Sequence, residues 1–525
     1  MKHPGWIAAA AVVALSLSAC SSSKNAAQGG GKLVNGGTFT MAISNDLGNL
    51  NPYTTVLSDT NMFDQFLYQG LVDQDANGNP VPSLAEKFSA TLTTASFTIR
   101  KGVTCSDGQP FGAADVAATI NWVANPANKA SILGQAVQVG TKATADEATN
   151  TVTVQSGQPD AFLLLDLSDV AMVCRNALQN TKLLAAGKGG TGLFTLGDSV
   201  PGDHYSLNRR KDYSWGPGNW KNNQPGLPDK VVAKVVSNAT TAANLLLSGQ
   251  LNYGGVEGPD EKRLRAAHLF SIDSYSVEGE IWFNEAAGHP GADLSVRRAI
   301  IQALDLPQVG KVLTSGTGKP ADQMLASNNP EPCPGNTVQG NIPATDIAAA
   351  KAALDAAGWL MGSNGYRSKQ GSQLTFTLAH FTSPGNQTNA VELIQQQLKQ
   401  IGVRVLDKPG DGVAFNHVVV SGAFDMALVG AGENLPSQFV PLFSGPTFAN
   451  GGKNLGDVHN PVYEALVRKA SAIPGKEGCS TWNQAESELI KRVDIVPFYL
   501  LPTPTFGHGA TFGTVQFPWS IRVTA

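Results

Sequence analysis

Residues 278–302 read EGEIWFNEAAGHPGADLSVRRAIIQ and divide this 525-residue chain into two parts of different character. The apolar run 281–283 predicts a short buried strand, and the Gly- and Pro-containing residues after it predict a loop. Asp293 is a suitable helix N-cap, because apolar residues at helical spacing follow it. One unit therefore ends on a strand and another begins with a helix, which predicts a crossover between two lobes, with function where the lobes meet.

The helix predicted after Asp293 has one apolar face. Arg297 and Arg298 lie among its apolar positions, which are Leu294, Val296, Ala299, Ile300 and Ala303. Since charged side chains usually remain in water, we expect both arginines on the exposed face of this helix.

The residues after the crossover alternate between strand and helix patterns. Residues 374–378 alternate as a strand, 391–401 have the spacing of a helix stopped by Gly402, and 403–406 predict the next strand. Such a βαβ unit is typical of an α/β sheet. The apolar segment 495–501 predicts a strand that returns to the first lobe. Two crossings between the lobes would make a hinge.

The residues before the crossover are rich in strands and turns. Residues 38–43 predict a strand and 64–71 a short helix. The segment 187–192, GKGGTG, matches G-x-G-x-x-G. A dinucleotide site needs a strand before this motif and a helix after it. Here a helix-like segment precedes it and a strand follows, so we interpret it as a turn.

The composition is that of an ordinary soluble protein, with 42% hydrophobic and 15% charged residues. A chain of this length exceeds one typical core, so two or three domains are expected. The formal net charge is −4, and no run of Lys and Arg interrupts the sequence. Binding to nucleic acid is therefore not expected.

The first twenty residues predict a signal peptide. Lys2 is followed by an apolar run over 7–17, which is too short to span a bilayer. Residues 17–20 read LSAC and resemble the bacterial lipobox, in which the Cys is lipidated after cleavage. We therefore expect a lipid on Cys20, a flexible tether over 21–35 and an extracytoplasmic protein anchored to the cell membrane. An ordinary secretory leader is the alternative.

Four further cysteines remain in the exported part of the chain. An even number in an oxidising compartment permits disulfides, although spacing alone does not determine the pairing. We favour Cys105 with Cys174 and Cys333 with Cys479, because each pair then falls on one side of the crossover. Four buried thiols are the alternative.

Three stretches near the start of the mature chain carry a family resemblance. They are residues 36–55 (GGTFTMAISNDLGNLNPYTT), 70–88 (GLVDQDANGNPVPSLAEKF) and 97–122 (FTIRKGVTCSDGQPFGAADVAATINW). They resemble the opening of the bacterial family 5 extracellular solute-binding proteins, the peptide- and nickel-type binding components of ABC importers. Residues 190–218, 245–252, 281–309 and 349–359 continue the resemblance in the family's order.

The resemblance implies a two-lobed α/β fold of the type II periplasmic-binding-protein kind, enlarged by a subdomain. The expected first lobe comprises 36–71, 189–280 and 502–525, with the subdomain over 72–188, and 281–501 make the second lobe. It also implies a short peptide bound between the lobes and delivery to ABC permease subunits in the membrane. We expect a monomer without a cofactor.

The resemblance also implies an acidic residue in the loop after a second-lobe strand, where peptide-binding members pair a carboxylate with the ligand's ammonium group. Glu433 is the nearest match in the loop 430–434, and Asn434 follows it. A desolvated, charge-assisted hydrogen bond would suit selection of a free amino terminus. An ordinary exposed loop acid is the alternative.

Five other residues are candidates for the walls of the cleft. Trp282, Phe283 and Asn284 lie at the crossover, and alternation puts the two aromatic rings on opposite faces of the strand, so only one is expected to meet the cleft. Packing in the core is the alternative for both rings. Tyr53 and Glu257 are candidates for the first-lobe wall.

Signals of catalysis or metal binding are missing from the sequence. The chain has no H-E-x-x-H, no clustered His and Cys, and no G-x-S-x-G, so neither a metal site nor an enzyme is expected. Three alternatives stay open. They are a binder of nickel, a metal chelate or another small solute, with His380 or His417 contributing; an exported hydrolase; and a lipid-held scaffold.

Overall fold

The computed structural model describes residues 31–55, 58–325, 332–382, 386–430, 433–514 and 517–525. The predicted signal peptide and Cys20 lie outside these residues. Within them, no helix is both long and apolar enough to cross a membrane.

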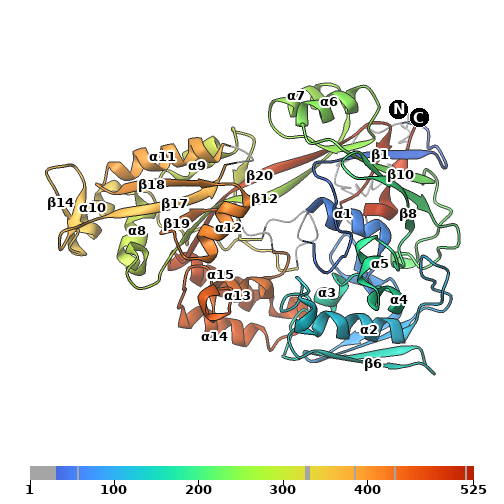
Figure 1. Cartoon of the computed structure of the whole chain (residues 1–525). Coiled ribbons are helices and arrows are strands. Elements are labelled where there is room, and N and C mark those ends of the chain that lie inside the picture. The colour runs from blue at the N-terminus through green and yellow to red at the C-terminus, as the bar shows by residue number, and fades with distance from the viewer. Residues whose placement is uncertain (1–30, 56–57, 326–331, 383–385, 431–432, 515–516) are drawn as a thin grey trace, which may run out of the picture.

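One eleven-stranded sheet runs through both halves of the molecule (Figure 1). In spatial order its strands are β18 (Arg404–Gly410), β17 (Thr375–Phe381), β19 (Met426–Leu428), β12 (Phe270–Phe283), β20 (Ile495–Gly507), β11 (Tyr253–Gly255), β1 (Thr38–Ile43), β10 (Lys230–Val235), β9 (His204–Arg209) and β8 (Phe194–Val200), with β13 (Lys319–Pro320) paired to β20. We call the half built on β18, β17 and β19 the second lobe, and the half built on β11, β1 and β10 to β8 the first lobe.

The antiparallel strands β12 and β20 connect the lobes. Their pairing extends from Phe270 opposite Gly507 in the first lobe to Trp282 opposite Ile495 in the second. The register shifts on either side of Gly279, where a Cβ atom would lie 2.8 Å from the Cβ of Tyr499. The predicted crossover and the predicted return strand are therefore confirmed as one long pair, and we take its irregular middle as the candidate hinge.

The second lobe confirms the predicted βαβ unit. β17 and β18 are parallel, and α11 (Gln387–Lys399) connects them. Asp293, Asp346 and Asn460 cap the helices that follow them by accepting hydrogen bonds from backbone N–H groups. The other helices of this lobe are α8 (Leu294–Gln302), α9 (Leu306–Leu313), α10 (Ile347–Ala356), α12 (Gly412–Val420), α13 (Val440–Phe443), α14 (Pro461–Ala470) and α15 (Cys479–Lys491), and β14 (Leu360–Met361), β15 (Arg367–Lys369) and β16 (Ser372–Gln373) form a small sheet.

The first lobe corrects one predicted helix. The helix expected over 64–71 is α1 (Ser58–Leu67). The chain after Leu67 is extended, because the carbonyl groups of Leu67, Gln69 and Leu71 accept backbone hydrogen bonds from Gly192, Met172 and Ala85. These partners are distant in sequence, so local helical spacing could not reveal them. The lobe also contains α6 (Ala239–Leu247), α7 (Pro259–Ala266), α16 (Phe517–Ser520), β21 (Ala510–Thr511) and β22 (Arg522–Val523).

A second, four-stranded sheet lies within residues 72–188 and packs against α2 (Ala113–Ala124) (Figure 1). Its strands, in order, are β4 (Ala85–Ala90), β5 (Thr94–Ile99), β7 (Thr151–Gln155) and β6 (Lys142–Asp146); β2 (Val72–Gln74), β3 (Pro80–Pro82), α3 (Leu163–Ser168), α4 (Arg175–Leu178) and α5 (Thr181–Ala185) complete the segment. One hydrophobic core joins Phe97 of this segment to Phe39 of β1. The segment is therefore packed onto the first lobe rather than built around a core of its own.

Both disulfides have the pairing favoured from the sequence. Cys105 is bonded to Cys174 and Cys333 to Cys479, with Cα–Cα distances of 6.2 and 4.9 Å. Segment 187–192 is a turn between α5 and β8, as predicted.

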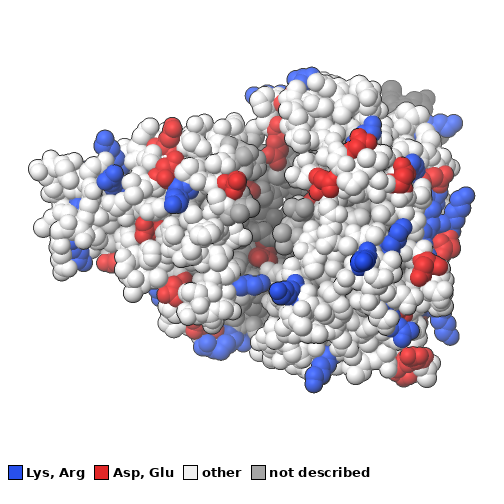
Figure 2. All heavy atoms as spheres, viewed as in Figure 1, with Lys and Arg blue, Asp and Glu red and all other residues white. Residues whose placement is uncertain are grey.

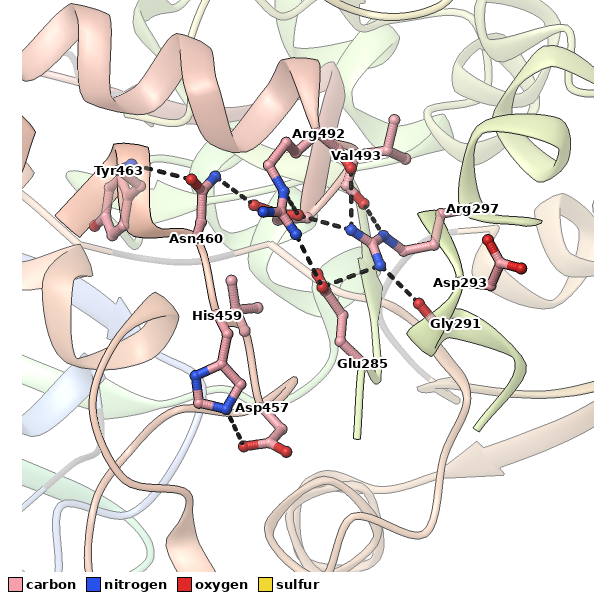
Figure 3. Close-up of polar contacts among 12 residues, drawn as sticks. Glu285, Gly291, Asp293, Arg297, Asp457, His459, Asn460, Tyr463, Arg492 and Val493 are labelled. Carbon is pink, nitrogen blue, oxygen red and sulfur yellow. Dashed lines mark hydrogen bonds and ion pairs between the residues drawn. The ribbon is translucent and has the colours of Figure 1, made fainter. Parts of the chain in front are cut away.

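The expected exposure of Arg297 is wrong, whereas Arg298 is exposed as predicted. The Arg297 side chain is 1% exposed and forms ion pairs with Glu285 at 3.0 Å and Asp494 at 2.9 Å (Figure 3). It also donates hydrogen bonds to the carbonyl groups of Gly291 and Val493. The acidic partners stabilise the buried cation, and neither could be recognised from the helix pattern alone.

Candidate ligand-binding cleft

A cavity of about 640 Å³ lies on the first-lobe side of the molecule and extends to the second lobe at Asn434. Figure 2 shows a hollow between the two lobes. The lining comes from α1 and the extended chain after it, two loops of the 72–188 segment and the C-terminal region, and comprises Pro52, Thr55, Asn61, Asp64, Gln65, Tyr68, Gln69, Gly70, Val72, Asp73, Gln74, Ser131, Ile132, Gln135, Ser168, Asp169, Ala171, Asn434, Thr514 and Trp519. This volume and this mixture of polar and aromatic groups are typical of small-ligand sites.

The second-lobe loop that begins at Gly430 reaches the first lobe. A Cβ atom on Gly430 would lie 1.5 Å from the carbonyl oxygen of Val277, so only glycine permits this close approach to β12. Farther along, the Gln438 side chain accepts the backbone N–H group of Asn434 and donates a 3.0 Å hydrogen bond to Asp166. Gly430 therefore lies against β12, and Asn434 is tied through Gln438 to Asp166 of the first lobe.

The predicted site residue Glu433 lies in this loop and is half-buried. Burial raises the pKa of its carboxyl group, and the nearby positive charge of Lys453 opposes that shift. Its neighbour Asn434 is exposed and lines the cavity. Asn434 therefore reaches the cavity, whereas Glu433 is not among the lining residues and its contact with a ligand stays a prediction.

Trp282, Phe283 and Asn284 are placed in the core instead of on the cavity wall. Trp282 stacks on Phe443 with ring centroids 4.7 Å apart and donates its indole N–H to Val429. Phe283 lies on the opposite face of β12 in a separate core cluster, so the predicted alternation is confirmed. The Asn284 amide donates to the carbonyl groups of Gly422 and Phe424. All three are enclosed by second-lobe partners, and the expectation of ligand contact is not met here.

Tyr53 and Glu257 also lie away from the lining. Tyr53 is fully buried, donates its hydroxyl group to the carbonyl of Ala171 and packs against the Trp122 ring at 5.2 Å. It supports the wall from behind, since Pro52 and Ala171 line the cavity. Glu257 is exposed, and desolvation together with the neighbouring Glu278 carboxylate raises its pKa.

Three carboxylates that the sequence analysis did not select line the cavity, namely Asp64, Asp73 and Asp169. Burial raises the pKa of Asp64 well above its ordinary value and that of Asp73 to about 6. Desolvation, with repulsion from Asp73, raises the pKa of Asp169 to about 7, although the residue is exposed and solvent screening weakens this shift. One signal was available, because Asp64 stands among the apolar residues Phe63, Phe66 and Leu67.

The lobes also touch on the side away from the hinge. The N–H group of Gly475 donates to the carbonyl of Ala161 at 2.7 Å, and the Lys476 ammonium donates to the carbonyl of Asn77 at 2.8 Å. The Phe162 and Trp482 rings pack with their centroids 6.1 Å apart. The cleft is therefore bounded at both ends by contacts between the lobes.

Neither histidine proposed for metal binding lies on the cavity lining. His380 is fully buried and its ring nitrogens bond to Asp407 and to the carbonyl of Phe381. His417 is exposed on α12. Among the residues that the structure describes, no group of three or more His, Cys, Asp and Glu side chains is arranged to hold a metal ion.

Two lobes joined by a pair of long strands, with a cavity that reaches both lobes, are the architecture of a protein that binds a ligand in an interlobe cleft. The chain belongs to the bacterial extracellular solute-binding proteins, family 5, whose model matches residues 79–451. The expected family and the two-lobed α/β fold are thus confirmed.

Individual relatives agree with this assignment. The chain is 27% identical over 435 residues to the oligopeptide-binding protein AppA of Bacillus subtilis, covering 75% of this chain and 74% of the relative. It is 26% identical over 382 residues to the nickel-binding periplasmic protein of Escherichia coli, covering 70% of each chain. A substrate-binding protein of Microbacterium hydrocarbonoxydans, solved with 4-hydroxybenzoate hydrazide, has a similar fold with a TM-score of 0.74 at 23% identity, covering 93% of this chain and 100% of that one.

Proposed function

We propose that this protein is the substrate-binding lipoprotein of an ABC importer, which captures short peptides between its lobes and delivers them to a membrane permease. It acts as a monomer, is held to the membrane by a lipid on Cys20 and catalyses no reaction. The observation that supports the peptide assignment is a polar cavity that reaches the second lobe at Asn434, the residue that follows the half-buried Glu433 in the chain.

Ligand binding between the lobes would favour the closed arrangement, because only a ligand that contacts both lobes interacts differently with the open and closed states. Glu433 and Asn434 would be the second-lobe contribution, and α1 with the chain after it would be the first-lobe contribution. The irregular middle of the β12–β20 pair would absorb the motion.

Native mass spectrometry of protein lacking residues 1–20 tests this proposal. Gentle unfolding should release co-purified masses that match short peptides, or the empty protein should gain such masses from a peptide mixture. A protein that binds no peptide but gains the mass of a metal chelate or another solute would overturn the peptide assignment and leave the family unaffected.

Glu433→Gln should weaken binding of peptides with a free amino terminus by about ten- to hundredfold, because a hydrogen bond between charged groups is replaced by a neutral one. Titration calorimetry with a peptide and its N-acetylated form measures the effect. The variant and the wild type should bind the acetylated peptide with nearly the same affinity. Glu392→Gln, on the exposed side of α11, is the charge-matched control. Equal affinities of wild type and variant for the free peptide would remove Glu433 from the site.

Cys20→Ser should abolish lipid attachment, because the acyl chain needs the thiol. Metabolic labelling with an alkyne fatty acid, followed by membrane fractionation, should detect labelled wild type in the membrane and unlabelled variant outside it. Ser22→Ala is the matched control and should stay labelled. Lipid label on the Cys20→Ser variant would contradict the anchor assignment.

A nickel or metal-chelate ligand is the second candidate, favoured by the similarity to the nickel-binding periplasmic protein. A rise in the unfolding temperature with nickel chelates, and none with peptides, would support it. An exported hydrolase is the remaining alternative, and turnover of a bound peptide into fragments would favour it.

A further inference from the structure

The cleft cavity is lined by acidic groups without a basic partner. Asp64, Asp73 and Asp169 line it, whereas no Lys, Arg or His stands among its described lining residues. Three carboxylates in one partly desolvated space repel one another, as the effect of Asp73 on the pKa of Asp169 indicates. A cationic group inside the cavity would relieve this repulsion.

Asp64 is an independent sign of a missing partner. It lies on the inner face of α1 and is 6% exposed. Neither of its carboxyl oxygens has a hydrogen-bond partner within the part of the chain that the structure describes. Desolvation is the cause of its raised pKa, and no neighbouring positive charge counteracts it.

A buried carboxyl group without partners is costly to the folded protein, and most buried polar side chains are hydrogen-bonded. Charged residues are almost never buried unless they are paired. A ligand ammonium or guanidinium group would supply the donors and the charge that Asp64 lacks. The aromatic residues Tyr68 and Trp519 add an apolar wall that can pack against the methylene groups of a long cationic side chain.

We propose that the first-lobe cavity is a recognition pocket for a cationic side chain, so that this protein prefers peptides that contain Lys or Arg. Asp64 forms the buried end of the pocket, and Asp73 and Asp169 complete it. The inference rests on the proposed peptide-binding function and adds a second charge requirement to the one assigned to Glu433.

The test compares tripeptides of alanine that carry one lysine with the same peptides carrying norleucine, which keeps the alkyl chain but has no charge. Because the position that meets the pocket is not specified, all three positions are used. Wild type should bind the best lysine peptide about tenfold or more tightly than its norleucine counterpart.

Asp64→Asn keeps the volume of the side chain and should remove most of this preference while leaving the affinity for the norleucine peptide within about twofold. The double variant Asp73→Asn/Asp169→Asn, at less buried positions, should also reduce it. Asp146→Asn, in the exposed β6–β7 hairpin, changes the net charge equally and should retain the full preference.

The outcomes separate this inference from the function on which it rests. Tight binding of norleucine and lysine peptides alike would overturn the cationic pocket and keep the peptide function, whereas binding of neither would overturn both. Asp64→Asn could instead weaken binding of the lysine and norleucine peptides equally, while N-acetylation of either peptide weakens its binding to the wild type to the same extent. The pocket then takes the amino terminus, and the side-chain assignment is wrong.

The preference should also depend on pH. A bound cation stabilises the ionised carboxylates, so it lowers pKa values that are raised in the free protein, and binding releases protons. The ratio of lysine to norleucine affinity should therefore be largest above pH 7 and fall as the pH drops from 7 to 5, through the pKa of about 7 for Asp169 and about 6 for Asp73. A constant ratio would contradict the proposal.

Other titratable groups lie close to these carboxylates. They are Tyr53 and Tyr68 beside Asp64, Tyr213 beside Asp73, and Asp166 beside Asp169.

Discussion

Arg297→Met should lower the free energy of unfolding of the second lobe by about 3–5 kcal/mol, because the substitution leaves buried acidic groups without their main partner. Arg297 contacts Glu285 (Figure 3) and also Asp494. Its own side chain is 1% exposed. Arg492 contributes only longer contacts, at 4.0 Å to Glu285 and 3.5 Å to Asp494. Burial and the neighbouring Asp494 carboxylate already raise the pKa of Glu285.

Urea unfolding followed by circular dichroism measures this loss, with hydrogen exchange to assign it to the second lobe. Arg298→Met is the matched control, because Arg298 is the adjacent residue, is exposed and donates a single hydrogen bond, to the carbonyl of Lys491. The control should change stability by no more than about 0.5 kcal/mol. If both substitutions lowered the free energy of unfolding equally, the buried ion pairs of Arg297 would contribute nothing specific to stability.

Removal of the Cys333–Cys479 disulfide by a double substitution to alanine should cost about 2–5 kcal/mol, because the bond closes a loop with a sequence separation of 146 residues. Closing a long loop restricts the unfolded chain more than closing a short one. The bond also joins residue 333 to α15, which packs against α14 in the second-lobe core. Unfolding of the variant should therefore begin in the second lobe.

Hydrogen exchange locates the effect. The variant should exchange faster in α14 and α15 and at the wild-type rate in α2 and the sheet of the 72–188 segment. Cys105→Ala/Cys174→Ala is the reciprocal control, with a separation of 69 residues and its effect in that segment. A reductant should reproduce both effects in the wild type. Unchanged stability after complete reduction would refute the prediction.

Much of the fold could be predicted from the sequence because it depends on local chemistry. Apolar patterns identified β1, the βαβ unit and the return strand β20, and Asp293 marked the start of α8. The disulfide pairing followed from the position of each Cys relative to the crossover. The family resemblance singled out loop 430–434, which follows a second-lobe strand and carries an acid; Asn434 lines the cavity, and the ligand-binding role of Glu433 stays a prediction.

The burial of charged and aromatic side chains was decided by tertiary structure. Arg297 is buried because Glu285 and Asp494, the latter 197 residues away, surround it. Trp282 and Phe283 contact two different cores instead of the cavity, since strands and helices cover both faces of β12. The cavity brings together residues from 52 to 519 of the chain. Whether a carboxylate such as Asp64 meets water, a partner or an empty space depends on these distant neighbours, and local sequence patterns contain no information about them.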